Sequence, residues 1–331
     1  MSFKDIIGQD KAITILKEHI KHARLASAYL FSGPQGVGKK MAAKTLSKVL
    51  NCQNESLDPC DGCPSCLKID KNQHPDVFVI DAATPIDSDR SDSGDSNAIK
   101  INHIRQLQRS IALRPYEGKS KVFIIDDAHN LTAEASNALL KILEEPPRNS
   151  LIILISAKPN LLFKTIISRC RVLKFHPMGR AELERILRNN YSLNSDLAHF
   201  LAYFCEGKIG QAIKLKDTDI LLDKNKVIDN FVILRNFRPE GLLVKNRDTL
   251  RDYLNILATW FRDIYLVKTG VMHSELINAD RRPELLKLMQ RFSFSELDEI
   301  FRVISSSVLR LEENVNVKLM ISNLRMELWR E

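Results

Sequence analysis

Residues 33–40 read Gly33-Pro34-Gln35-Gly36-Val37-Gly38-Lys39-Lys40. This stretch matches the phosphate-binding loop pattern of Gly, four residues and Gly-Lys, in which backbone N–H groups cradle phosphates and the lysine reaches the β- and γ-phosphates. The pattern then asks for Ser or Thr, whose hydroxyl binds Mg²⁺, but this chain has Lys40. Because an ammonium group has no lone pair for a metal, the binding of ATP and Mg²⁺ is left in doubt. The residues expected to line this degenerate loop are Gly33, Gly36, Gly38, Lys39 and Lys40.

The residues around the loop predict the strand and the helix that such a loop connects. Ala28–Ser32 is a short apolar run before it, and residues 39–50 after it are good helix formers. Apolar residues at helical spacing predict another helix, which Thr132 caps and which runs to Glu145. Buried strands are predicted at residues 76–80, 122–125 and 151–156, and a further short strand at 171–175. Alternating strands and helices predict a parallel sheet with helices on both faces and ligands at the carboxyl ends of the strands.

The pattern changes after His176-Pro177, where the rest of the chain is predicted to be helical. The expected domains are an α/β P-loop domain at residues 1–177 with an inserted cysteine module at about 51–67, a small helical lid domain at 178–218, and an all-helical domain at 219–331. Residues 84–98 hold four aspartates among serines and almost nothing apolar, which predicts a mobile surface loop.

Composition is that of a soluble globular protein, with 331 residues, 44% hydrophobic and 27% charged. No apolar run approaches the roughly 18 residues of a membrane span, and the first residues lack the layout of a signal peptide. We therefore expect a cytoplasmic protein without a membrane partner. The net charge of +8 is compatible with a polyanionic partner and equally with a surface that is charged for solubility.

Four cysteines, Cys52, Cys60, Cys63 and Cys66, lie within fifteen residues. Four thiolates at this spacing can close a tetrahedral Zn²⁺ site, so we predict structural zinc. A disulfide pair is one alternative, although reducing compartments keep thiols free. A redox dithiol is another, but it would need only two of the four cysteines.

Acidic residues follow the strand predicted at residues 122–125. Asp126 stands where an ATPase of the P-loop type holds Mg²⁺, usually through water, and Asp127 stands where such enzymes commonly have Glu. The shorter side chain would retract the carboxylate by roughly 1.5 Å, about one carbon–carbon bond. Catalytic geometry rarely tolerates such a shift. The alternative is that both acids merely cap the end of the strand.

Several further motifs carry a family resemblance. They are Ile6-Ile7-Gly8-Gln9, Arg114-Pro115-Tyr116-Glu117-Gly118-Lys119, the segment from Ala138 to Pro147, Ser168-Arg169-Cys170, and Trp260-Phe261-Arg262-Asp263. With the P-loop and the cysteine cluster, they make nearly the whole chain resemble the bacterial clamp-loader branch of the AAA+ family, whose members serve DNA polymerase III.

The resemblance implies roles for single residues. Arg169 matches the arginine finger, which reaches into the ATP site of a neighbouring subunit, where a guanidinium suits γ-phosphate oxygens. The arginine that active relatives place after the P-loop domain is replaced by Gly210, with Lys208 nearby. Lys40, Asp127 and Gly210 therefore depart together from the active pattern. The resemblance thus implies a subunit of the polymerase holoenzyme that serves a neighbour's hydrolysis and performs little of its own.

The implied assembly contains other loader subunits of the gamma/tau and delta types, with the last helical domain joining a collar. It would open the sliding clamp and place it on primed DNA. One rival interpretation is a catalytically active gamma/tau-type ATPase that tolerates Lys40. Another is a zinc-dependent module that binds DNA alone, for which Arg105 and Arg109 could contact phosphates; these two are equally compatible with a solvated helix face.

Overall fold

The computed structural model describes residues 2–85, 98–233, 247–270, 275–312 and 326. It divides into two compact units, the first comprising Met1–Met178 with Lys208–Gln211 and the second comprising Gly179–Gly207 with Ala212–Glu331. The separation of a lid domain at 178–218 from a domain at 219–331 stays a prediction. Most of the loop predicted to be mobile, residues 86–97, lies outside the described residues.

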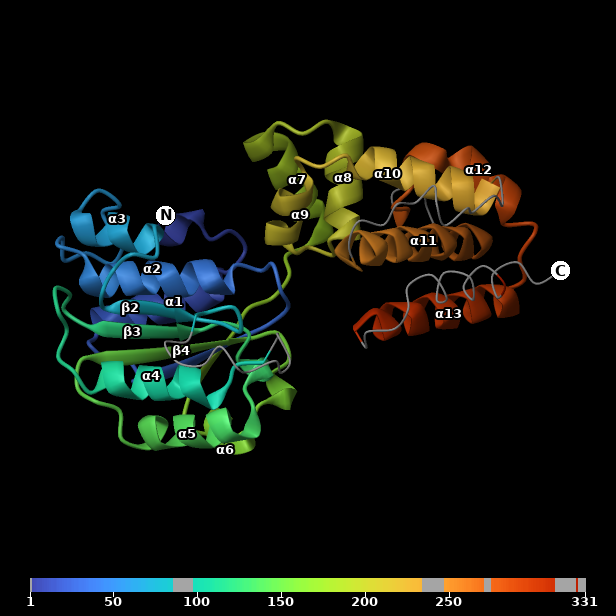
Figure 1. The fold of residues 1–331 in the computed structure, drawn as a ribbon. Helices are drawn as coiled ribbons and strands as arrows, with labels where there is room; N and C mark the ends of the chain where they lie inside the picture. Colours follow the sequence, from blue (N-terminus) through green and yellow to red (C-terminus); the bar gives the residue numbers. More distant parts are fainter. Residues whose placement is uncertain (1, 86–97, 234–246, 271–274, 313–325, 327–331) are drawn as a thin grey trace. The chain divides into compact units, whose positions relative to one another are not determined.

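A five-stranded parallel sheet in the order β2-β3-β4-β1-β5 forms the centre of the first unit (Figure 1). Its strands are β1 (Ala28–Ser32), β2 (Val77–Ile80), β3 (Lys121–Ile125), β4 (Ser150–Ser156) and β5 (Arg171–Lys174). The predicted strands are thus confirmed to within one residue at either end. One residue predicted to lie in a strand, Asp76, stands just before β2 instead.

Helices cover both faces of this sheet, which is the α/β architecture expected from the sequence (Figure 1). The helices are α1 (Asp10–Lys21), α2 (Lys39–Asn51), α3 (Pro64–Asp70), α4 (Ile101–Ile111), α5 (Ala133–Glu144) and α6 (Lys164–Ile167). One apolar core packs α1 and α2 against the sheet, and a second packs α4, α5 and α6 against the other face. Strands buried on both faces explain why β1 and β3 are apolar without alternation.

Parallel pairing brings the ends of the strands to one edge of the sheet. Ser32 at the end of β1 is in register with Ser156 of β4, and Ile125 of β3 is in register with Leu154 of the same strand. The P-loop after β1 and the acids after β3 therefore share this edge, where parallel sheets bind ligands.

The regular elements in the described part of the second unit are all helices, joined by turns and loops. Its helices are α7 (Arg180–Tyr191), α8 (Ser195–Phe204), most of α9 (Ile209–Leu215), α10 (Ile220–Val227), α11 (Arg247–Lys268), α12 (Arg282–Leu288) and α13 (Phe294–Glu312). The long helix α11 buries Leu254, Trp260 and Phe261 and packs against α13. No helix in the described part of the chain is both long and apolar enough to cross a membrane.

Candidate nucleotide and metal sites

The P-loop joins β1 to α2 through glycines whose backbone conformations suit no other residue. Gly38, the residue before α2, has φ 97°, and Gly36 has φ 78°. Gly33 has φ 149°, and a Cβ there would lie 2.1 Å from the carbonyl oxygen of Phe175. These three positions require glycine because a side chain would be strained or would clash. These backbone conformations are compatible with the loop expected from the sequence, and phosphate binding by it stays a prediction.

Lys39 is turned back onto the loop that carries it. Its Nζ donates hydrogen bonds to the carbonyl oxygens of Gly33 and Pro34, both at 2.6 Å, and the residue is buried. Burial lowers the pKa of Lys39 to about 8, against the opposing attraction of Asp127 and Asp126. The ammonium group is thus occupied by protein carbonyls, and contact with a phosphate would require it to exchange or share these partners.

Lys40 forms an ion pair with Asp126, with 2.9 Å between Nζ and Oδ2. The second carboxylate oxygen of Asp126, Oδ1, accepts the backbone N–H of Asp127 at 3.1 Å. Both oxygens of this carboxylate are therefore engaged by the protein. The sequence predicted that Lys40 removes a Mg²⁺ ligand, and the geometry adds that its ammonium lies against the acid that would hold the metal.

Asp127 adopts a left-handed backbone conformation, with φ 48°, which is uncommon for a residue other than glycine. Its Oδ1 lies 4.0 Å from Nδ1 of His129, and burial lowers the pKa of that histidine. The two aspartates expected near the nucleotide are therefore both at the sheet edge. Only Asp126 is paired with a lysine of the P-loop helix.

Gly210 packs directly against the P-loop, in the segment Lys208–Gln211 that belongs to the first unit. Its backbone N–H donates to the carbonyl oxygen of Gly36 at 2.7 Å. A Cβ at Gly210 would lie 2.8 Å from that same oxygen, closer than real Cβ contacts. The position that the resemblance assigns to an arginine in active relatives is thus held here by a residue that must lack a side chain.

Arg169 follows the short helix α6 and is partly exposed. Its Nη1 donates to the carbonyl oxygen of Thr165 at 3.0 Å, and its Nη2 lies 2.8 Å from Oε1 of Glu144, the last residue of α5. The predicted arginine finger therefore has a carboxylate partner in its own chain. No pattern in the sequence indicated this pairing.

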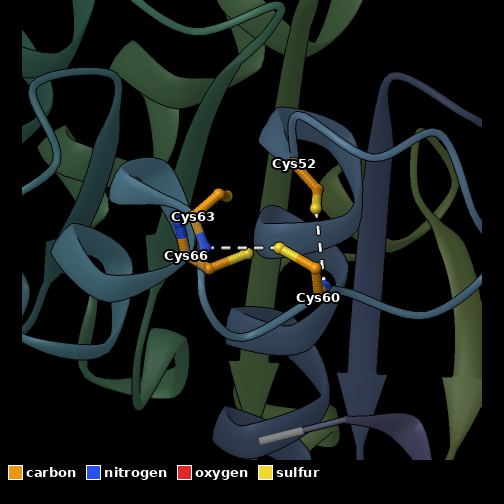
Figure 2. Close-up of side chains that lie close together, drawn as sticks. All are labelled: Cys52, Cys60, Cys63 and Cys66. Carbon is orange, nitrogen blue, oxygen red and sulfur yellow. Dashed lines mark hydrogen bonds between the residues drawn. The ribbon is translucent and has the colours of Figure 1, made fainter.

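The four cysteines lie together, with all four sulfur atoms within 4.8 Å of one another (Figure 2). Tetrahedral zinc with Zn–S bonds of about 2.3 Å would require sulfur–sulfur distances of roughly 3.8 Å, a small contraction from this arrangement. All six cysteines of the chain are free, so the cluster contains no disulfide. The arrangement suits a structural metal such as zinc.

Backbone N–H groups point at the sulfur atoms of this cluster. Cys52, Cys60 and Cys63 accept hydrogen bonds from the amides of Cys60, Cys63 and Cys66 respectively, at 3.3–3.5 Å (Figure 2). Burial would raise the pKa of Cys63, but amide donors, including those of Gln53 and Cys66, outweigh it and lower the value to about 6. Donors aimed at sulfur favour the thiolate form, which is the form that binds metal.

A buried lysine ties this cysteine module to the P-loop helix. Lys48 of α2 pairs with Asp61, which lies between two of the cysteines, and with Asp70 of α3 at 2.8 Å. Burial would lower the pKa of Lys48, but the hydrogen bonds that its ammonium donates to both carboxylates outweigh this effect and raise the pKa. Removing either acid would leave a buried charge with less compensation. Neither contact was predicted from the sequence.

Asp76 is a further buried acid that the sequence assigned only to a strand. Its carboxylate accepts the backbone N–H groups of Tyr116, Glu117 and Gly118 at 2.8–2.9 Å. Burial would raise the pKa of Asp76, but these three donors outweigh it and lower the pKa. The loop of the motif at residues 114–119 is thereby fixed to the start of β2. The structural role of Asp76 is therefore to anchor this loop.

The two arginines considered for DNA contact lie on α4. Arg105 and Arg109 are exposed and one helical turn apart, and Arg105 donates weakly to Asn102 at 3.5 Å. Arg109 also lines a groove of about 830 Å³ along the edge strand β2, which extends to Lys40. The exposure of both arginines is compatible with phosphate contacts and with a solvated helix face alike.

Comparison with known proteins identifies the family. Residues 8–179 match the family model described as DNA polymerase III, delta subunit, and residues 240–328 match the model of its C-terminal part. Together these matches cover most of the chain. The chain therefore belongs to the DNA polymerase III delta subunit family.

Within that family the chain is of the delta-prime type, a clamp-loader subunit. It is 28% identical over 331 residues to DNA polymerase III subunit delta' of Bacillus subtilis, covering 96% of this chain and 94% of that relative. It is also 35% identical over 227 residues to subunit tau of Escherichia coli, a match that covers 66% of this chain and 33% of tau. Among solved structures, a gamma subunit-related protein of Thermotoga maritima aligns with a TM-score of 0.47 and 18% identity, covering 96% of this chain and 98% of that protein.

Proposed function

We propose that this chain is a subunit of the clamp loader that does not itself hydrolyse ATP, and that it supplies Arg169 to the ATP site of a neighbouring subunit. The observation that carries the first half is the ion pair of Lys40 with Asp126 at 2.9 Å. A monovalent ammonium fixed to the protein lies against the acid that would hold Mg²⁺. Since phosphoryl transfer depends on the metal to neutralise developing charge, the site lacks a required part.

Two further contacts support this half of the proposal. The Lys39 ammonium is held by loop carbonyls, and Gly210, where the resemblance implies an arginine in active relatives, packs against Gly36. A nucleotide would therefore meet neither a free P-loop lysine nor a second arginine. We infer that the ion pair of Lys40, the hydrogen-bonded Lys39 and the missing side chain at Gly210 together prevent hydrolysis.

The second half of the proposal concerns Arg169. A partly exposed guanidinium at the end of a short helix can cross an interface, and its planar fork matches phosphate oxygens. In related chemistry an arginine finger contributes roughly 10³–10⁵ in rate. We expect the partners to be gamma/tau- and delta-type subunits, with the sliding clamp and primed DNA as the substrates of the assembly, in the cytoplasm.

ATP turnover by the purified chain tests the first half directly. The proposal predicts background hydrolysis with and without Mg²⁺. Robust Mg²⁺-dependent turnover that is lost on Lys39→Ala would contradict it and would favour the alternative, an active gamma/tau-type ATPase. The 35% identity to tau is the observation that keeps this alternative worth testing.

A further inference from the structure

Arg169 and Glu144 form an ion pair within one chain, between the end of α6 and the end of α5. The two helices pack on the same face of the sheet (Figure 1). The side chains of Arg169 and Glu144 are 35% and 52% exposed, so water and salt screen the attraction between them. The pair is therefore accessible to exchange with another anion.

Glu144 lies at a position in its helix that is unfavourable for a carboxylate. It is the last residue of α5, and the chain continues with Glu145, Pro146 and Pro147. The C-terminal end of a helix carries partial negative charge, so a carboxylate there is unfavourable by typically 0.3–1 kcal/mol. A nearby guanidinium offsets this cost. The structure thus explains the acid at this position by its pairing with Arg169.

The contact leaves part of the guanidinium's capacity to bind anions unused. Only Nη2 of Arg169 meets the carboxylate, while Nη1 donates to the carbonyl oxygen of Thr165. A phosphate can accept two parallel hydrogen bonds from the same fork, which makes a stronger and more specific contact. A phosphate group presented by a neighbour should therefore displace the single contact with Glu144.

We propose that Glu144 is a positioning residue that holds Arg169 in a parked conformation and releases it when a neighbour's nucleotide is presented. This inference rests on the role proposed above for Arg169 and adds the residue that regulates it. In the chain without a neighbour, the carboxylate stands in for the phosphate and keeps the long side chain ordered near the interface. The arginine then exchanges one anion for another during catalysis.

The test uses a reconstituted loader that carries Glu144→Gln, with assembly checked by size exclusion. The amide retains the shape but removes the charge, so the arginine no longer has to break an ion pair. We expect kcat/KM for ATP at the affected site to rise by roughly 1.4- to 5-fold, the range for an exposed ion pair. The rise should shrink as salt is increased. Glu145→Gln is the matched control, because it removes the same charge from the next residue and should change nothing.

Adding Glu144→Gln to Arg169→Ala separates positioning from a general structural effect. We expect Glu144→Gln to have no effect once the arginine is gone. An equal effect with and without Arg169, or a fall or no change in kcat/KM on Glu144→Gln alone, would overturn the parked conformation. If Arg169→Ala itself leaves the ATPase unchanged, the proposed arginine finger fails and the inference about Glu144 fails with it. If the ATPase falls with Arg169→Ala but kcat/KM does not rise with Glu144→Gln, only the inference about Glu144 fails, and the proposed arginine finger stands.

Discussion

Replacing Lys40 by threonine should give the P-loop a Mg²⁺-dependent affinity for nucleotide. Threonine supplies the hydroxyl that the loop pattern asks for, and it removes the ammonium that lies 2.9 Å from Asp126. The side chains of this pair are 46% and 20% exposed, so the ion pair itself contributes little to stability. The variant should therefore fold normally while the acid becomes available to a metal.

Repulsion between charges sets the size of the effect. Two unit charges about 4 Å apart interact by about 1 kcal/mol in water, and Mg²⁺ carries two charges, so Lys40 would oppose the metal by roughly 2 kcal/mol. A lower effective dielectric constant at the partly buried site would increase this repulsion energy. At about 1.4 kcal/mol per factor of ten, Mg²⁺-nucleotide binding should tighten by about 30-fold or more in Lys40→Thr.

Titration of a fluorescent ATP analogue, with Mg²⁺ and with EDTA, measures this effect. The variant should bind more tightly with Mg²⁺, whereas the natural chain should show no gain from the metal. Lys44→Thr is the matched control, because it removes a lysine one turn further along α2 and should behave as the natural chain does. Equal Mg²⁺-dependent binding by the natural chain and by Lys40→Thr would refute the assignment of Lys40 to the place of the metal.

Three other predictions concern the zinc module, a buried acid and the P-loop contact. Metal analysis should find about one zinc per chain and near none in Cys63→Ser; natural protein with no metal, or with a Cys60–Cys63 disulfide, would contradict this prediction. Asp76→Asn should lower the free energy of unfolding in urea by about 1.5–3 kcal/mol at neutral pH. Because the folded-state pKa of Asp76 is lowered, the difference should vanish as the pH falls through that value, and a pH-independent difference would contradict the account. Gly210→Ala should cost about 1–3 kcal/mol through its clash with Gly36, so unchanged stability would show that the loop adjusts freely.

The sequence predicted the parts of the fold that local patterns determine. Apolar runs gave the strands within one residue, and glycine positions gave a P-loop whose φ values require them. The cysteine spacing likewise predicted a cluster whose sulfurs do lie together. In each case the residues that decide the structure are close in the chain, so spacing carries the information.

The contacts between distant residues could not be predicted in this way. Lys40 meets Asp126, Gly210 meets Gly36, and Arg169 meets Glu144 only because the sheet and helices bring separate segments together. The loop pattern showed that Lys40 replaces a hydroxyl, and the family resemblance implied that Gly210 replaces an arginine, but neither showed the contacts that these two residues make. Such pairings depend on register and helix placement, which single-residue patterns do not encode.

Whether Arg169 acts in a neighbour's ATP site is decided by comparing loaders reconstituted with the natural chain and with Arg169→Ala. The variant should assemble, its total ATPase should fall partially because one site of several loses its finger, and its clamp loading should fall further. Arg169→Lys should restore little, since an ammonium cannot reproduce the planar fork. A loader that assembles with Arg169→Ala and loads clamps at the normal rate would show that Arg169 is only a surface residue.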